Sequence, residues 1–151
     1  MAEVNTTQGA KLVAGSKLLP NEAHGRVRVL YAKMPATFAQ MAINDTIFLG
    51  RIPAGARILT SGLVSCAAGT TSSTIDIGLR KTSDGTVIDA DGIAASVNTA
   101  AAGQKDANTG ALIASGAEYV TATECDVYAT VTGAVLAANQ ALKVEIPYVC
   151  D

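Results

Sequence analysis

The residues best suited to chemistry in this chain lie in one stretch, IFLGRIPAGARIL, at residues 47–59. Two arginines, Arg51 and Arg57, flank a proline and a glycine, and glycine-rich turns beside basic residues can bind phosphate. The stretch lacks both G-x-G-x-x-G and G-x-x-x-x-G-K-[ST], and no helical pattern follows it to supply a helix N-terminus. We therefore interpret it as two strands joined by a stiff corner, in which Pro53 fixes φ and Gly55 permits a conformation closed to other residues.

The cysteines and the histidine form no catalytic or metal-binding pattern. The chain has three cysteines, one histidine (His24) and no C-x-x-C pair, whereas a structural zinc site needs four ligands, usually at close spacing. A Ser–His or Cys–His nucleophile would have to use His24, and no G-x-S-x-G is present. We predict no metal, no cofactor and no enzymatic activity, with Cys66, Cys125 and Cys150 as small buried or half-buried thiols.

Two further groups resemble ligand-binding patterns. Asp89-Ala-Asp91-Gly92 looks like the start of a calcium loop, but position 93 is isoleucine and no glutamate follows within the next ten residues. These residues therefore predict a turn or loop rather than a metal site. Tyr128 is the one isolated aromatic candidate for a sugar platform, in a chain without tryptophan. A carbohydrate-binding module is thus kept as an alternative.

Composition excludes several classes of partner. Of 151 residues, 49% are hydrophobic and 16% charged, with a net charge of −2. No basic stripe is visible, so we expect no nucleic-acid binding. No apolar run approaches the ~18 residues of a membrane helix. The first residues lack the basic and apolar segments of a secretion signal, so we expect synthesis in a cytoplasm.

From Arg26 onward, apolar and polar residues alternate, which is typical of strands with one buried face. Pro147 cannot donate to a ladder, so it predicts an edge position or a bulge. The rows expected to face the core are Val27–Val29–Tyr31, Ile75–Ile77–Leu79, Val127–Ala129–Val131 and Leu142–Val144–Ile146–Tyr148.

These strands predict an all-β fold, an antiparallel β-sandwich of about eight strands, with a jelly roll as the first choice. Asp84-Gly85 is a strong hairpin signal between IDIGLRKT and TVIDA. Residues 92–116 are rich in alanine and glycine and predict a loop or lid, with a short helix at Ile93–Ala102. Residues 1–25 show neither the two-residue alternation of a strand nor the 3.6-residue repeat of a helix. They predict an extended N-terminal arm, followed by the sandwich domain at 26–151.

The order DTIFLGRIPAGARIL, STIDIGLR and DVYATVTGAVLAANQALKVEIPYV resembles small structural proteins of tailed-bacteriophage virions, in particular capsid decoration, or cement, proteins. The resemblance spans residues 26–151. It implies a non-enzymatic protein, made in the host cytoplasm, that binds the outer surface of the phage head and stabilises it. The implied partners are the major capsid protein and further copies of the chain, as a homodimer or homotrimer. Head-fibre bases and tail proteins share similar patterns and remain an alternative.

Apolar residues of the arm suit docking in a neighbour's groove or adding a strand to an open edge. The alternative is a frayed terminus. The two arginines of the corner suit carboxylates of a neighbouring subunit. The predicted interface residues are therefore Val4, Leu12, Val13, Leu18, Leu19, Arg51 and Arg57.

Overall fold

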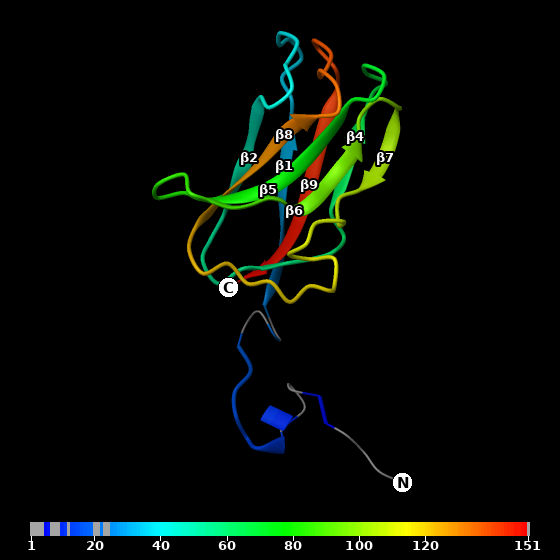
Figure 1. Ribbon diagram of the computed structural model, residues 1–151. Helices are drawn as coiled ribbons and strands as arrows, with labels where there is room; N and C mark the ends of the chain where they lie inside the picture. Colours follow the sequence, from blue (N-terminus) through cyan, green and yellow to red (C-terminus); the bar gives the residue numbers. More distant parts are fainter. Residues whose placement is uncertain (1–4, 7–9, 12, 20–21, 23–24, 151) are drawn as a thin grey trace.

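The computed structural model describes residues 5–6, 10–11, 13–19, 22 and 25–150. These residues form nine β-strands that build two packed sheets (Figure 1). The strands are β1 (Arg26–Lys33), β2 (Thr46–Ile52), β3 (Arg57–Ile58), β4 (Leu63–Cys66), β5 (Thr74–Lys81), β6 (Val87–Asn98), β7 (Gly103–Asp106), β8 (Cys125–Thr132) and β9 (Leu142–Cys150).

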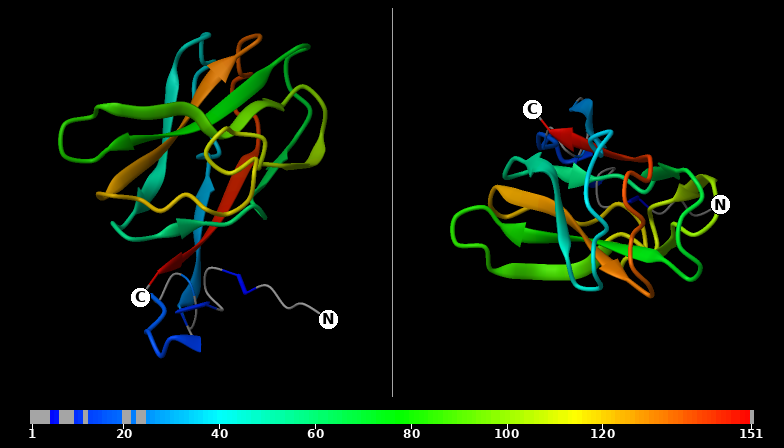
Figure 2. Two further views of the ribbon diagram at one scale, coloured as in Figure 1. Left: turned by 60° about the horizontal axis from the view of Figure 1, so that its bottom comes forward. Right: turned by 90° about the horizontal axis from the view of Figure 1, so that it is seen from above.

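All strand pairs are antiparallel, which confirms the predicted β-sandwich. One sheet has the order β1-β9-β4-β7, with β3 also paired to β9, and the other has the order β2-β8-β5-β6. The two sheets can be followed as separate layers in the right-hand view of Figure 2. The chain changes sheet at every connection except β3–β4 and β5–β6. This winding supports the jelly-roll prediction.

The core lies between the inner faces of the two sheets. Burying each such large apolar side chain stabilises the fold by about 1.5–3 kcal/mol relative to leaving it in water. Three of the rows predicted to face the core are buried, with Tyr148 at the end of the last row half-buried. The buried rows are Ile75–Ile77–Leu79, Val127–Ala129–Val131 and Leu142–Val144–Ile146.

The predicted burial of the first strand is wrong. Val27, Val29 and Tyr31 do share one face of β1, but that face is exposed, while Leu30 on the opposite face is buried. Alternation separates the two faces of a strand, but it does not tell which of them meets the other sheet. In β1, Leu30 is buried in the core and the half-buried Ala32 packs against it, so the more apolar row is the outer one.

Of the two positions predicted for Pro147, an edge or a bulge, the edge is wrong, because β9 lies between β1 and the pair β3/β4. Its carbonyl accepts a hydrogen bond from the N–H of Leu59. Since N–H and C=O of one strand residue point to the same side, the missing donor also faces that side. There the partner of β9 changes from β3 to β4, so the proline lies at the end of one ladder rather than inside it.

The predicted helix at Ile93–Ala102 is also wrong, because β6 runs through Asn98. The alanines there favour a helix locally. Burial of Ile93, Ala94 and Val97 in the core stabilises the strand instead, and it outweighs that local preference. The predicted hairpin before it is confirmed. Gly85 has φ of +73° and donates its N–H to the carbonyl of Lys81. The long irregular segment follows β7 instead, at residues 107–124.

The register of β5 against β6 shifts three times, so β6 bulges across the outer face of its own sheet. Gly78 of β5 lies beneath the bulge. A Cβ on Gly78 would lie only 2.3 Å from the carbonyl oxygens of Asp89 and Ala90. Glycine is therefore the residue that permits this close approach of two backbones.

The predicted corner between β2 and β3 is confirmed, and it carries the chain from one sheet to the other. Gly55 has φ of +77°. Thr121, which is buried, holds the corner: its hydroxyl donates to the carbonyl of Pro53 (2.7 Å) and accepts from the N–H of Ala56 (3.0 Å). This corner is a scaffold element, and no helix N-terminus follows it.

The described residues of the arm lie beyond the end of the sandwich at which β1 begins (Figure 1). They include one helical turn, in which the N–H of Ala14 donates to the carbonyl of Ala10, so the arm is not extended throughout. Lys11 forms an ion pair with Glu22 at 2.6 Å. Among the described residues, no helix has both the length and the apolar character to cross a membrane.

Candidate assembly interface

A row of exposed apolar side chains stands on the outer face of β1. Val27, Val29 and Tyr31 keep 64%, 55% and 55% of their surface exposed. We call these three residues the β1 strip. A contiguous apolar row on an otherwise polar surface marks a contact site more often than a scattered one. The first strand of the sandwich therefore presents a candidate interface.

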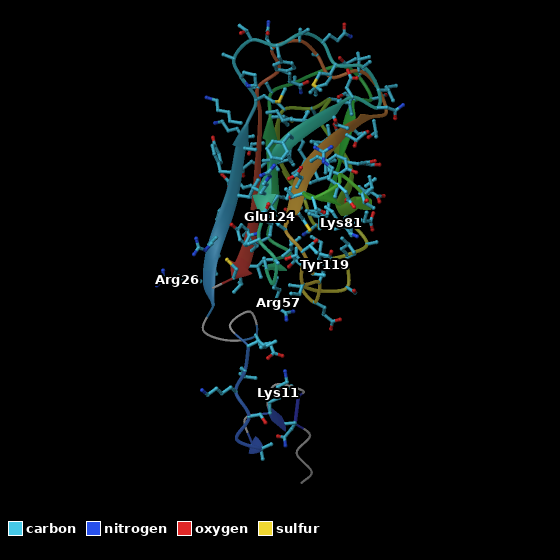
Figure 3. All side chains as sticks on the ribbon, turned by 90° about the vertical axis from the view of Figure 1, so that its left-hand side faces the viewer. Lys11, Arg26, Arg57, Lys81, Tyr119 and Glu124 are labelled. Carbon is cyan, nitrogen blue, oxygen red and sulfur yellow. The ribbon has the colours of Figure 1, made fainter. Side chains whose placement is uncertain are left out.

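The strip lies on an unpaired strand edge. The N–H of Met34 donates to the carbonyl of Leu142, in register with the β1–β9 ladder. Hydrogen-bonding direction alternates along a strand, so even-numbered residues of β1 face β9 and odd-numbered residues face away. The N–H and C=O groups of Val27, Val29 and Tyr31 consequently point outward. In Figure 3, β1 forms the margin of the molecule, with no further strand beyond it.

The other edge strands of the described chain are protected against pairing. β7 has four residues and carries Lys105, and β2 is interrupted by a bulge between Phe48 and Gly50. Short length, a lysine and a bulge each hinder a further strand from adding. β1 is longer, with eight residues and no bulge in its register against β9, although it carries two arginines and ends in Lys33.

The edge of β6 is covered by the segment that follows β7. The N–H of Gly110 donates to the carbonyl of Ile93 (2.9 Å), and the N–H of Leu112 donates to that of Gly92 (3.0 Å). The hydroxyl of Thr109 bonds to both main-chain groups of Ala95. Residues 107–124, rather than the predicted 92–116, thus act as a cover for one edge of the sandwich.

A small pocket of about 140 Å³ opens between β1 and β2. Its walls are mainly apolar, and Phe48 stands exposed at its rim. The lining residues of this pocket that come from the two edge strands are Ala32, Lys33, Ile47, Phe48 and Leu49. The pocket has no cluster of titratable groups, so it suits an apolar side chain rather than a reactive substrate.

Arg51 has its carboxylate partner within the same chain. Its Nε lies 3.0 Å from Asp126, which is also 3.5 Å from Arg80 and accepts a hydrogen bond from Thr82 (2.9 Å). Burial raises the pKa of Asp126, but the hydrogen bonds from Thr82 and Arg51 and the two positive charges outweigh it. The pKa therefore lies below the ordinary aspartate value. A role of Arg51 between subunits stays a prediction.

Arg57 lies on the other sheet, at the end of the sandwich nearest the arm (Figure 3). Its guanidinium donates to the carbonyl of Ala117 at 2.5 Å, which ties β3 to the covering segment. The two predicted arginines are thus placed on different sheets and engage different partners, and the interface role of Arg57 also stays a prediction.

Three of the predicted arm residues are described. Val13 and Leu19 are exposed and Leu18 is half-buried. Val4 and Leu12 lie outside the described residues, as does His24. None of the described arm residues pairs with a strand of the sandwich. The side chains of Val13 and Leu19 therefore remain available for contacts in the single chain.

The other chemical candidates have local explanations. Tyr128 lies on the outer face of β8 as predicted, but only 4% of it is exposed, and the guanidinium of Arg80 covers its ring at 5.1 Å. No sugar could stack on that ring. Within the described residues, no three acidic, cysteine or histidine side chains gather as a metal site would require. Cys66 is half-buried, and Lys105 Nζ lies 3.4 Å from its sulfur.

Sequence reasoning did not identify the β1 strip as an interface, because the same alternation also describes a strand facing the core. The arrangement of edges could not be inferred from β1 itself. It depends on β9, whose Cys150 pairs with Arg26 more than a hundred residues away.

Comparison with known proteins gives a match in fold. Neither a protein-family model nor a curated protein matches the sequence. A chain in the capsid of Ralstonia phage GP4 is similar with a TM-score of 0.66 and 18% identity, over 84% of this chain and 86% of that one. A chain in the capsid asymmetric unit of cyanophage Pam1 is similar with a TM-score of 0.50 and 17% identity, over the full length of both. At these identities the likeness shows a shared fold.

Proposed function

We propose that this chain is a non-enzymatic structural protein of a tailed-phage virion, and more specifically a capsid decoration protein. In this role it binds the outer surface of the head, contacts the major capsid protein and stabilises the shell. The observation that carries the proposal is the similarity in fold, over most of both chains, to a chain of the Ralstonia phage GP4 capsid.

The surface of the chain supports a role in assembly. An exposed apolar strip lies on an unpaired eight-residue edge, and an arm with exposed apolar side chains lies beyond the end of the sandwich at which β1 begins. Strand addition and apolar burial are common ways to attach one chain to another. Many copies on one shell, each bound modestly, give durable attachment when neighbouring contacts are linked.

The test is the thermal disruption of capsids from the phage that encodes this protein, prepared with and without it. We expect the protein to bind these capsids and to raise the temperature at which they release DNA, because a ligand that binds only the intact shell stabilises it. Unchanged disruption temperature at saturating protein would count against the decoration role.

Electron microscopy of labelled particles distinguishes a decoration protein from other virion parts. Label spread over the head surface supports the proposal. Label confined to a fibre base or to the tail would assign the chain to that part instead. The carbohydrate-binding alternative loses its basis, because the ring of Tyr128 is covered.

A further inference from the structure

We propose that two copies of this chain pair along their free β1 edges, antiparallel and about a two-fold axis that passes beside Val29. The two sheets then continue into one, and the arm of each copy reaches the pocket between β1 and β2 of the other. The pair forms without a capsid shell, so it goes beyond the proposed function and does not rest on it.

The backbone of β1 is ready to accept a strand. Its eight residues have no bulge in their register against β9, and such a strand spans about 27 Å at roughly 3.4 Å per residue. The N–H and C=O groups of its odd-numbered residues point away from β9. In an antiparallel pair, outward groups meet outward groups. Odd-numbered residues of one copy therefore face odd-numbered residues of the other, which leaves few possible registers.

The β1 strip selects one of these registers. When Val29 lies opposite Val29 of the second copy, Val27 lies opposite Tyr31, so every strip residue pairs with a strip residue. Each facing pair of this kind exchanges two backbone hydrogen bonds. Aromatic and β-branched side chains form favourable pairs across strands. The apolar row that is exposed in the single chain thus becomes part of an interface.

The neighbouring registers fit less well. A shift in one direction places Arg28 opposite Arg28, and like charges on facing strands are destabilising. A shift in the other direction places Lys33 opposite Val27. In the register centred on Val29, every basic residue of β1 faces an uncharged one. The two copies of Arg28 are then diagonal neighbours at about 7–8 Å, where repulsion in water is weak. The strand is therefore complementary to itself in this register.

The two-fold axis also brings the arm of each copy to the pocket of the other. Gly25, the residue before β1, lies opposite Lys33 of the second copy in this register. The arm lies beyond the end of the sandwich at which β1 begins (Figure 1). In the pair, it consequently continues past Lys33 toward Met34 and Pro35, which line the pocket. Leu19 is 58% exposed, and its six-residue distance from Gly25 spans at most roughly 20 Å.

Leu19 is therefore the arm residue that we assign to the pocket. The pocket holds about 140 Å³ between mainly apolar walls, which suits one apolar side chain. The arms also enlarge the contact, because stable dimers bury about 800 Å² on each partner and a single strand edge is small beside that. Since the interface is two-fold, each copy both gives an arm and receives one. A second copy thus accounts for the free edge, the pocket and the arm together.

The mass of the protein in solution tests the pair. We expect analytical ultracentrifugation to show a dimer that dissociates on dilution. Val29→Pro removes an N–H that points outward and leaves the bonds to β9 in place, and Tyr31→Lys puts a charge beside Val27 of the second copy. Each should raise the dissociation constant at least about tenfold, with unchanged circular dichroism. Val87→Lys is the matched control, because Val87 of β6 is 54% exposed on another edge, and it should leave the constant unchanged.

Cysteine crosslinking tests the register. All variants carry Cys66→Ser, because Cys66 is half-buried and the other two cysteines are buried. Val29→Cys should crosslink to its own second copy with a reagent about 5 Å long, since facing residues of a hydrogen-bonded pair have Cα atoms about 5.5 Å apart. Val27→Cys and Tyr31→Cys should each fail to crosslink alone and should crosslink when mixed, because only the mixture places two thiols at facing positions.

Leu19→Ser tests the arm. It should weaken dimerisation severalfold without changing the melting of the diluted, monomeric protein, because it removes the side chain that fills the pocket. Lys17→Ser, at another exposed arm residue, is the matched control and should dimerise normally. Equal dissociation constants for these two variants would contradict the docking of Leu19.

A monomeric mass at every concentration would overturn the pair, and so would crosslinking of Val87→Cys but not of Val29→Cys. If hydrogen exchange at the amides of Val27, Val29 and Tyr31 slowed only on capsid shells, a shell segment rather than a second copy would occupy the edge. Shell binding is measured separately. A monomer that binds shells leaves the proposed function standing, whereas a dimer that binds no shell overturns the proposed function alone.

Discussion

Asp126 holds together the outer face of the sheet that contains β2, β8 and β5. Its carboxylate joins Arg51 of β2, Arg80 of β5 and Thr82, and Arg80 in turn covers the ring of Tyr128. One buried carboxylate thus links residues from three parts of the chain. Its loss would leave two arginines and a hydroxyl without their common partner.

We expect Asp126→Asn to lower the free energy of unfolding by about 1–3 kcal/mol, because charge-assisted hydrogen bonds are lost. The folded pKa of Asp126 is depressed, so its contribution is complete above the unfolded value of about 3.9 and is lost as pH falls through the lower folded pKa. Urea unfolding from pH 7 to pH 2.5 measures this. The difference between variant and unmodified protein should shrink below about pH 4.

Asp106→Asn is the control for this prediction. Asp106 is exposed on β7, so its substitution should change stability by less than about 0.5 kcal/mol. If the two variants unfold at the same urea concentration, the Asp126 cluster does not stabilise the fold.

Gly78 is a position where a single added methyl group would collide with backbone atoms. Gly78→Ala should lower stability by about 2–4 kcal/mol, because the new Cβ would meet the carbonyls of Asp89 and Ala90 at 2.3 Å. Thermal unfolding measures the loss. At Gly85 an added Cβ would meet no other atom, but the backbone φ of +73° is unfavourable for alanine. Gly85→Ala should therefore lower the free energy of unfolding by only about 1 kcal/mol. A smaller loss at Gly78 than at Gly85 would contradict the close packing of β6.

Residue-level prediction from sequence succeeded where the cause is local. Pro53 and Gly55 carry their own conformational preferences, so the corner could be predicted. Thr121, which ties that corner, and Asp126, which binds Arg51, lie 65 and 75 residues away from their partners. No local pattern links such residues, so these contacts could not be predicted.

At the scale of elements, alternation located most of the strands, and the hairpin at Gly85 followed from its turn residues. The errors came from tertiary context. The outer row of β1, the central position of Pro147 and the strand at Ile93 were decided by neighbours in the sheets. The candidate interface was missed for the same reason, since an edge is a property of the sheet.

The arm is the element whose role is most separable from the sandwich. We expect deletion of residues 1–20 to leave the melting temperature of the sandwich unchanged, because no described arm residue pairs with its strands. Binding to capsid shells should weaken severalfold if the arm's apolar residues dock on a neighbour. Calorimetry and shell co-sedimentation measure the two effects.

A matched control replaces Val13 and Leu19, both exposed, with serine in the full-length chain. It should reproduce part of the weakening without shortening the arm. Shell binding as tight as that of the unmodified protein, for both the deletion and the serine variant, would refute a docking role for the arm.

At the scale of the whole molecule, most strand pairing is long-range. β1 pairs with β9, and β2 pairs with β8, so each sheet pairs an early strand of the sequence with a late one. Such topologies fold slowly, because distant segments must meet before they are stabilised. The same arrangement makes the sandwich a rigid platform on which one open edge and one arm are displayed.

The antiparallel pairing of β1 with β9 also has a mechanical consequence. Arg26 lies opposite Cys150 at one end of this ladder, and Lys33 lies opposite Lys143 at the other. A force that pulls the arm and the end of β9 apart acts across the strands at one end of the ladder. It breaks the hydrogen bonds one after another, starting with those next to Arg26 and Cys150. A force that pulls the arm and the far end of the sandwich apart acts along the strands. It loads the whole ladder in shear, so all its hydrogen bonds resist together. The ladder therefore resists a force between the arm and the far end of the sandwich better than a force between the arm and the end of β9.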